Sequence, residues 1–201
     1  MMRTNHTFSP SRSPQRGFTL IEVIISIAIM SIGILTLMAA FGAAIGSTSS
    51  AQQDLIARQK ALEAMESIYT ARNTQQITFN QIANIASGGI FTDGPTPLLY
   101  AGPDGLVNTA DDTNFAASGA CPAGPECIVV PGPDGILGTA DDQAMSLSNF
   151  TRQIQINNVL EPDGVSINPN LKQVTVTVTY NRIGQTLPHS YTVDALISAF
   201  R

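Results

Sequence analysis

The chain has 201 residues, of which 43% are hydrophobic and 12% are charged, and its formal net charge is −5. This length accommodates one globular domain with an extension. Without residues 1–17, seven basic residues would face fifteen acidic ones, which gives a net charge of −8. An acidic chain with no lysine or arginine cluster is unsuited to nucleic acid binding, because neutralising phosphates requires basic side chains.

One segment, residues 18–46, is almost entirely apolar and contains a single charged residue, Glu22. As a helix it would be about 43 Å long, which exceeds the roughly 30 Å hydrocarbon core of a membrane. It is also longer than the apolar core of an ordinary secretory signal. The residues before it include Arg3, Arg12 and Arg16. The positive-inside rule therefore places the N-terminus in the cytoplasm and the chain after Gly46 outside.

The junction before the apolar segment reads Arg16-Gly17-Phe18-Thr19-Leu20-Ile21-Glu22-Val23. This junction resembles the prepilin peptidase recognition motif of type IV pilin-like proteins, in which a basic leader ends in glycine and a Phe-Thr-Leu-Ile-Glu sequence opens the hydrophobic helix. The resemblance implies cleavage between Gly17 and Phe18 on the cytoplasmic side, followed by N-methylation of Phe18. Gly17 suits a cleavage site because a peptidase can readily extend the backbone at glycine.

Glu22 is expected to have a charged partner or to lie near the membrane surface, because an unpaired carboxylate in a membrane costs several kcal/mol. The resemblance implies that it pairs with the N-terminal ammonium of a neighbouring subunit, which would fix the register between subunits. The alternative is a single-pass anchor in which Glu22 lies near the membrane interface. The segment Ser31-Ile32-Gly33-Ile34-Leu35 also resembles PilV-type minor pilins and one minor pseudopilin of type II secretion.

The helical pattern continues beyond Gly46. Apolar residues recur at helical spacing among glutamines, lysine and glutamates, at Leu55, Leu62, Met65 and Tyr69. We expect this stripe to pack on a β-sheet. The expected helix therefore has a protruding half that is apolar all round and an amphipathic half embedded in a globular head.

Residues 150–199 have the alternation of β-strands. Val174, Val176, Val178 and Tyr180 would line one face of a strand, with threonines on the other. We predict an α+β pilin fold, in which the helix packs on an antiparallel sheet of three or four strands. The expected parts are a cleaved leader (1–17), a membrane or filament-core helix (18–46) and an exported head (47–201).

Residues 88–149 are expected to be a loop insertion rich in Gly, Pro and Asp. This segment contains an internal repeat, because eight of the eleven residues 102–112 recur in residues 132–142. Clustered carboxylates repel one another unless a cation neutralises them, and hard oxygen ligands suit Ca²⁺. One prediction is therefore two calcium sites, with the ligands Asp104, Asn108, Asp111 and Asp112, and Asp134, Asp141 and Asp142. The alternative is a pair of solvated Pro-Asp-Gly turns.

Cys121 and Cys127 lie between the two copies of the repeat. In an oxidising compartment we expect them to form a disulfide that closes a small loop. Two free thiols are the alternative. The pattern argues against a zinc site, because the spacing of the two cysteines differs from that of zinc ligands and no histidine lies nearby in the sequence.

The predicted function is that of a structural subunit, a minor pilin of a type IV pilus. Its expected partners are other pilins, the prepilin peptidase/methyltransferase and the inner membrane. The head would lie in the periplasm before assembly and in a filament afterwards. The alternatives are a minor pseudopilin of a type II secretion system and an unprocessed membrane-anchored domain that binds in a calcium-dependent way. The sequence contains none of the common enzyme motifs, and we predict no enzymatic activity.

Overall fold

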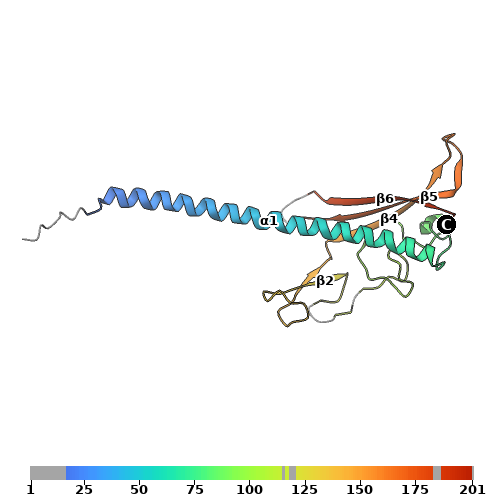
Figure 1. Ribbon diagram of the computed structural model, residues 1–201, viewed down its shortest axis with the longest axis horizontal. Helices are drawn as coiled ribbons and strands as arrows, with labels where there is room; N and C mark the ends of the chain where they lie inside the picture. Colours follow the sequence, from blue (N-terminus) through green and yellow to red (C-terminus); the bar gives the residue numbers. More distant parts are fainter. Residues whose placement is uncertain (1–16, 115, 118–120, 183–186, 201) are drawn as a thin grey trace, which may run out of the picture. The chain divides into compact units, whose positions relative to one another are not determined.

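The computed structural model describes residues 17–114, 116–117, 121–182 and 187–200. The predicted leader lies outside this range except for Gly17. The long helix α1 spans Leu20–Asn73, and the strands follow it in the chain (Figure 1). The chain divides into two compact units, the first of which ends at Gly46. The first contains the apolar half of α1, and the second, which we call the head, begins at Ser47.

Within the first unit, α1 is uninterrupted and every described residue is exposed. The exposed residues include sixteen large apolar side chains between Phe18 and Ile45. A helix that is apolar on all sides cannot remain in water without cost, and it requires lipid or other apolar helices around it. By length and composition, α1 also qualifies as a membrane-spanning helix.

A four-stranded antiparallel sheet with the order β1-β4-β5-β6 forms the centre of the head. Its strands are β1 (Thr96–Pro97), β4 (Phe150–Leu160), β5 (Ile167–Tyr180) and β6 (His189–Ser198). The register pairs Ile154 with Val176, and Val176 with Val193. The predicted alternation in β5 is confirmed, since Val174, Val176, Val178 and Tyr180 are buried.

The second half of α1 packs on this sheet, as predicted, but through a different stripe. Leu55 and Leu62 are 54% and 45% exposed, so their assignment to the packing face is wrong. The buried residues of the helix are mostly small, namely Ile56, Ala57, Ala61, Ala64, Met65, Ile68 and Ala71. The four alanines allow the backbone of the helix to approach its neighbours closely, which outweighs the larger apolar area of the two leucines.

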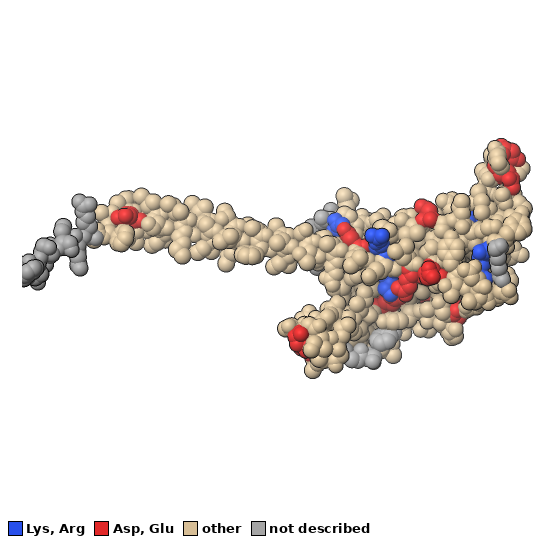
Figure 2. All heavy atoms as spheres, viewed as in Figure 1, with Lys and Arg blue, Asp and Glu red and all other residues tan. Residues whose placement is uncertain are grey.

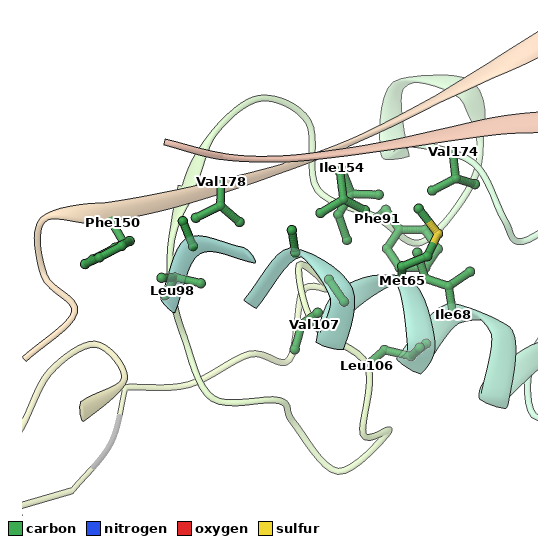
Figure 3. Close-up of a cluster of buried hydrophobic side chains, with 14 of the residues drawn as sticks. Met65, Ile68, Phe91, Leu98, Leu106, Val107, Phe150, Ile154, Val174 and Val178 are labelled. Atoms are coloured by element: carbon green, nitrogen blue, oxygen red, sulfur yellow. The ribbon is translucent and has the colours of Figure 1, made fainter. Parts of the chain in front are cut away.

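Residues 88–149 contribute to the core and also form a second, two-stranded sheet. The sheet consists of β2 (Cys127–Val130) and β3 (Gln143–Ser146), and a short 3-10 helix, η1 (Ile85–Ser87), precedes the segment. Phe91, Leu98, Leu106, Val107 and Leu147 are buried in the same cluster as α1 and the main sheet. Figure 3 shows Val174 and Val178 approaching from the sheet and Leu106 and Val107 from the loop side. These five residues of the predicted loop insertion are therefore part of the hydrophobic core.

Candidate functional site

The N-terminal motif starts α1. Thr19 immediately precedes the helix, and its Oγ1 accepts a hydrogen bond of 3.3 Å from the backbone N–H of Glu22. The motif thus provides an N-cap, which satisfies one of the amide groups that a helix leaves free at its start. Glu22 lies in the first turn, where a negative charge interacts favourably with the helix dipole. Gly17 and Phe18 precede the helix in a non-helical, exposed conformation.

Hydroxyl groups in the apolar half of α1 bond to the helix's own backbone. Ser26 donates to the carbonyl of Glu22 at 2.7 Å, and Ser31 donates to the carbonyl of Ile27 at 2.8 Å. Thr36 does the same with the carbonyl of Gly33. Polar groups satisfied within the segment are what an apolar surrounding requires.

The two repeated loops have the same internal structure. In the first, Asp104 Oδ1 accepts from the N–H of Leu106 at 2.8 Å, and Asp112 Oδ2 accepts from the N–H of Asn108 at 2.6 Å. In the second, Asp134 and Asp142 accept from the residues at the same places, Ile136 and Gly138, at 2.8 and 2.7 Å. Thr109 and Thr139 donate to Asp111 and Asp141 at 2.7 and 2.6 Å.

Glycine is required at the start of each loop. A Cβ atom at Gly102 would lie 2.3 Å from Oδ2 of Asp111, and one at Gly132 would lie 2.4 Å from Oδ2 of Asp141. Later in the loops the backbone adopts positive φ at Asn108 (63°) and Gly138 (91°), a conformation that asparagine and glycine tolerate better than other residues. The identical residues of the repeat therefore preserve one loop conformation.

These hydrogen bonds change the acidity of the loop carboxyls. The Thr109 hydroxyl holds the pKa of Asp111 below its ordinary value, and Thr139 does the same for Asp141. Burial raises the pKa of Asp112. The loops thus hold their aspartates with backbone amides and hydroxyls as partners.

The calcium prediction involves seven residues of these loops. Asn108 has other partners: its Nδ2 donates to Thr96 Oγ1 at 2.7 Å, and its Oδ1 accepts from Arg152 Nε at 2.6 Å. Within the described ranges, no three histidine, cysteine, aspartate or glutamate side chains are placed together as a metal would require. Calcium binding by the loops stays a prediction.

Sequence reasoning missed a group of buried charges, one of which, Arg152, contacts the first repeated loop. Arg152 is fully buried on β4, and its Nη1 and Nη2 have no hydrogen-bond partner among the described residues. Burial lowers the pKa of Arg152, and Glu126 is the carboxylate that most opposes this shift. Glu126, 5% exposed, pairs with Lys60 of α1 at 2.5 Å. The only signal in the sequence was an arginine at an inward position of a strand, between Phe150 and Ile154.

The predicted disulfide is confirmed. Cys121 and Cys127 are bonded, with their Cα atoms 5.8 Å apart. Cys127 is also the first residue of β2. The bond therefore closes a small loop at the base of the two-stranded sheet.

Comparison with known proteins identifies the N-terminal region. Residues 12–38 match the prokaryotic N-terminal methylation motif. Comparisons with curated proteins and with solved structures found no match. The chain carries a type IV pilin-like prepilin leader, and its long apolar helix on an antiparallel sheet is a pilin-like α+β arrangement. The motif supports a type IV pilin-like or pseudopilin subunit, and it implies processing by prepilin peptidase and assembly with other pilins.

Proposed function

We propose that this chain is a minor pilin of a type IV pilus. Prepilin peptidase removes residues 1–17, Phe18 becomes the methylated N-terminus, and the apolar half of α1 anchors the subunit in the inner membrane. The same half-helix then packs among the helices of other subunits in the filament. The role is structural and involves no catalysis by this chain.

One observation supports the proposal above the others: the methylation motif covers the start of a helix whose apolar half is exposed on every side. The matched residues, 12–38, include both the junction at Gly17 and most of the apolar segment. The exposed apolar side chains extend to Ile45. Such a surface is satisfied by lipid before assembly and by like helices afterwards, so one segment serves both environments.

Glu22 would make the assembly step selective. In a bundle of apolar helices its carboxylate needs a cation, and the ammonium of the mature Phe18 of a neighbouring subunit supplies one. Such a pair forms only after cleavage, because the precursor has no ammonium at this position. Processing and assembly would therefore be coupled.

Intact-mass spectrometry of the chain from membranes of its native host tests the proposal. The expected product begins at Phe18, carries one added methyl group and lacks the two hydrogens lost in the Cys121–Cys127 bond. A chain that retains residues 1–17 in a host with an active peptidase would contradict the pilin assignment. It would favour the unprocessed anchored domain instead.

A variant pair then separates processing from assembly. Glu22→Ala should be cleaved normally but should be absent from sheared filaments, whereas Glu66→Ala, an exposed glutamate of the same helix in the head, should be both cleaved and assembled. Recovery of the processed wild-type chain in surface filaments supports the pilus. Recovery only in the periplasmic and membrane fractions of a host with a type II secretion system would favour the pseudopilin.

A further inference from the structure

The two repeated loops share one internal structure but differ in their surroundings. Leu106 and Val107 of the first loop are 1% and 3% exposed and belong to the core. The residues at the same places in the second loop, Ile136 and Leu137, are 61% and 60% exposed. Since the two loops have the same conformation, the difference in exposure is due to the residues that pack against each loop. The second loop has no apolar surface to pack against in the described part of its own chain.

The second loop is held at the tip of a braced hairpin. Strands β2 and β3 flank it, with Val130 paired to Gln143 next to the loop and Cys127 paired to Ser146 at the base. A two-stranded hairpin alone is marginally stable. Here the disulfide ties the first residue of β2 to Cys121, and the hydrogen bonds accepted by Asp134 and Asp142 hold the loop at the tip. The hairpin therefore presents two adjacent aliphatic side chains in a fixed backbone conformation, which reduces the entropy lost on binding.

The first loop shows which kind of surface accepts this motif. Its aliphatic pair packs into an aliphatic core, and polar donors hold the loop's edges. The Gln76 side chain donates to the carbonyl of Asp104, and the buried Arg152 lies beside Asn108. A partner for the second loop should likewise combine apolar side chains with a cation, because Asp134, Asp141 and Asp142 lie in the same loop as the exposed pair.

A hollow whose lining combines apolar and polar side chains, with cations beside it, lies on the head itself. A hollow of about 380 Å³ is lined by Arg72, Gln75, Ile77, Thr78, Phe79 and Ala199. The ammonium of Lys172 lies 4.8 Å from the centre of the Phe79 ring. This hollow is at the end of the head where α1 finishes, and the β2–β3 hairpin is at the opposite end (Figure 1). Figure 2 shows acidic side chains at the hairpin tip, and both basic and acidic side chains at the other end of the head.

We propose that Ile136 and Leu137 of one copy of this chain dock into the Ile77–Phe79 hollow of a second copy. The aspartates of the loop then lie next to Arg72 and Lys172, so the charges at the contact are complementary. The contact joins two different surfaces, so it can link copies head to tail along a filament. The proposal rests on the proposed function, because assembly brings copies into contact, and it requires at least two adjacent copies. An acidic loop tip is unsuited to docking on an anionic membrane surface.

Photo-crosslinking of the full chain in host membranes and filaments tests the contact. A p-benzoyl-phenylalanine residue placed at position 136 should give a covalent dimer on irradiation, and mass spectrometry should locate the bond near residues 72–79 or 172. The matched control has the same residue at position 165. Val165 is also an exposed aliphatic residue (83%) beside carboxylates in a loop between two strands, and it should give no dimer.

Substitution of the two aliphatic residues at the loop tip provides an independent test of the contact. The double variant Ile136→Asp and Leu137→Asp should reduce dimer formation, detected by a crosslinker placed at position 79, about tenfold or more, as loss of a central apolar anchor does. Val165→Asp should leave dimer formation unchanged. Both changes are at exposed sites, and unaltered near-UV circular dichroism would establish that the head remains folded.

The outcomes separate this contact from the proposed function. Processed chains in filaments with no dimer through position 136, or with equal dimers through positions 136 and 165, would overturn the contact and leave the pilin assignment intact. A crosslink to another protein or to lipid would overturn it too. If the chain is never processed, the same crosslinking assay on the purified full chain in detergent tests the contact independently of the proposed function. A dimer mapped to the hollow supports it, and its absence overturns it.

Discussion

Nε of Arg152 lies 2.6 Å from Oδ1 of Asn108, and both side chains are enclosed in the head, with exposures of 0% and 1%. This hydrogen bond joins the first repeated loop to strand β4. It explains why the first copy of the repeat has asparagine at a position where the second has Gly138. The backbone at both positions has positive φ, which asparagine tolerates. Among the described residues, a buried guanidinium contacts the first loop and none contacts the second.

The first prediction concerns this bond. Asn108→Gly keeps a residue that is compatible with the backbone but leaves Nε of the buried arginine without its acceptor. A hydrogen bond to a charged group contributes about 1.5–3 kcal/mol, and leaving a buried donor unsatisfied adds to the cost. We expect the head to lose about 2–3 kcal/mol of unfolding free energy, measured by urea denaturation followed by near-UV circular dichroism.

The second copy of the repeat provides the control for that substitution. Gly138→Asn makes the reverse exchange at an exposed position, where surface substitutions usually change stability by less than about 0.5 kcal/mol. Equal destabilisation by both variants would show that the loop conformation, and not the buried hydrogen bond, is responsible.

The disulfide gives the second prediction. Its two cysteines are six positions apart, and closing so short a loop restricts the unfolded chain only modestly. Cys121→Ser combined with Cys127→Ser should lower the unfolding free energy by about 2 kcal/mol, with the largest increase in hydrogen exchange at β2 and β3. Treatment of the wild-type chain with a reductant should reproduce the loss. A loss confined to the reductant, with the double variant unaffected, would contradict this account.

The third prediction is a dependence of stability on pH. Arg182 donates to both carboxylate oxygens of Asp54, at 2.6 and 2.7 Å, and the Tyr180 hydroxyl also donates to Asp54. The Arg182 bonds, followed by that of Tyr180, lower the pKa of Asp54. Because the folded pKa lies below the unfolded one, the stabilisation is present in full above the unfolded pKa of about 3.9. It is lost as the pH falls through the folded pKa.

Asp54→Asn should therefore destabilise the head at pH 7 and flatten its acid unfolding profile below about pH 4. Asp54 is about half exposed, so the loss should be about 0.2–1 kcal/mol. Thermal unfolding of both proteins between pH 7 and pH 2 measures it. Asp93→Asn, which changes an exposed aspartate elsewhere in the head, controls for net charge. Parallel pH profiles for the wild type and Asp54→Asn would contradict the assignment.

The fourth prediction is calcium binding by the repeated loops. Oδ1 of Asp142 is enclosed and has no hydrogen-bond partner among the described residues, whereas Oδ1 of Asp112 accepts from Thr109 at 3.1 Å. If both loops bind calcium, the second loop has the freer carboxylate oxygen and should bind more tightly. Calorimetric titration of the full chain in detergent with CaCl₂ measures the number of sites and their affinities.

Variants of the corresponding aspartates assign any calcium sites that are found. Asp141→Asn should remove the tighter site and Asp111→Asn the weaker one, with little effect of each on the other loop. The absence of heat in the calorimeter, together with an unfolding temperature that is the same in calcium and in chelator, would leave the loops as turns held by their own hydrogen bonds.

The sequence by itself identified the features that depend on local patterns. The order of charge, glycine and apolar residues around Gly17 predicted the pilin-like leader, and the motif match at residues 12–38 agrees. The length of the apolar run predicted the long helix, and the valine-threonine alternation predicted β5 with its buried face. Such patterns can be recognised in a sequence because side chains of helices and strands return to the same face with fixed periods.

The tertiary structure decided what depends on contacts between distant residues. It placed the small alanines of α1 in the core, with Leu55 and Leu62 left exposed, because close approach to the sheet determines which face is buried. It also buried Leu106 and exposed Ile136, although the two loops are nearly identical in sequence. A repeat fixes the conformation of each loop through local hydrogen bonds, but burial depends on whether another part of the fold lies within reach.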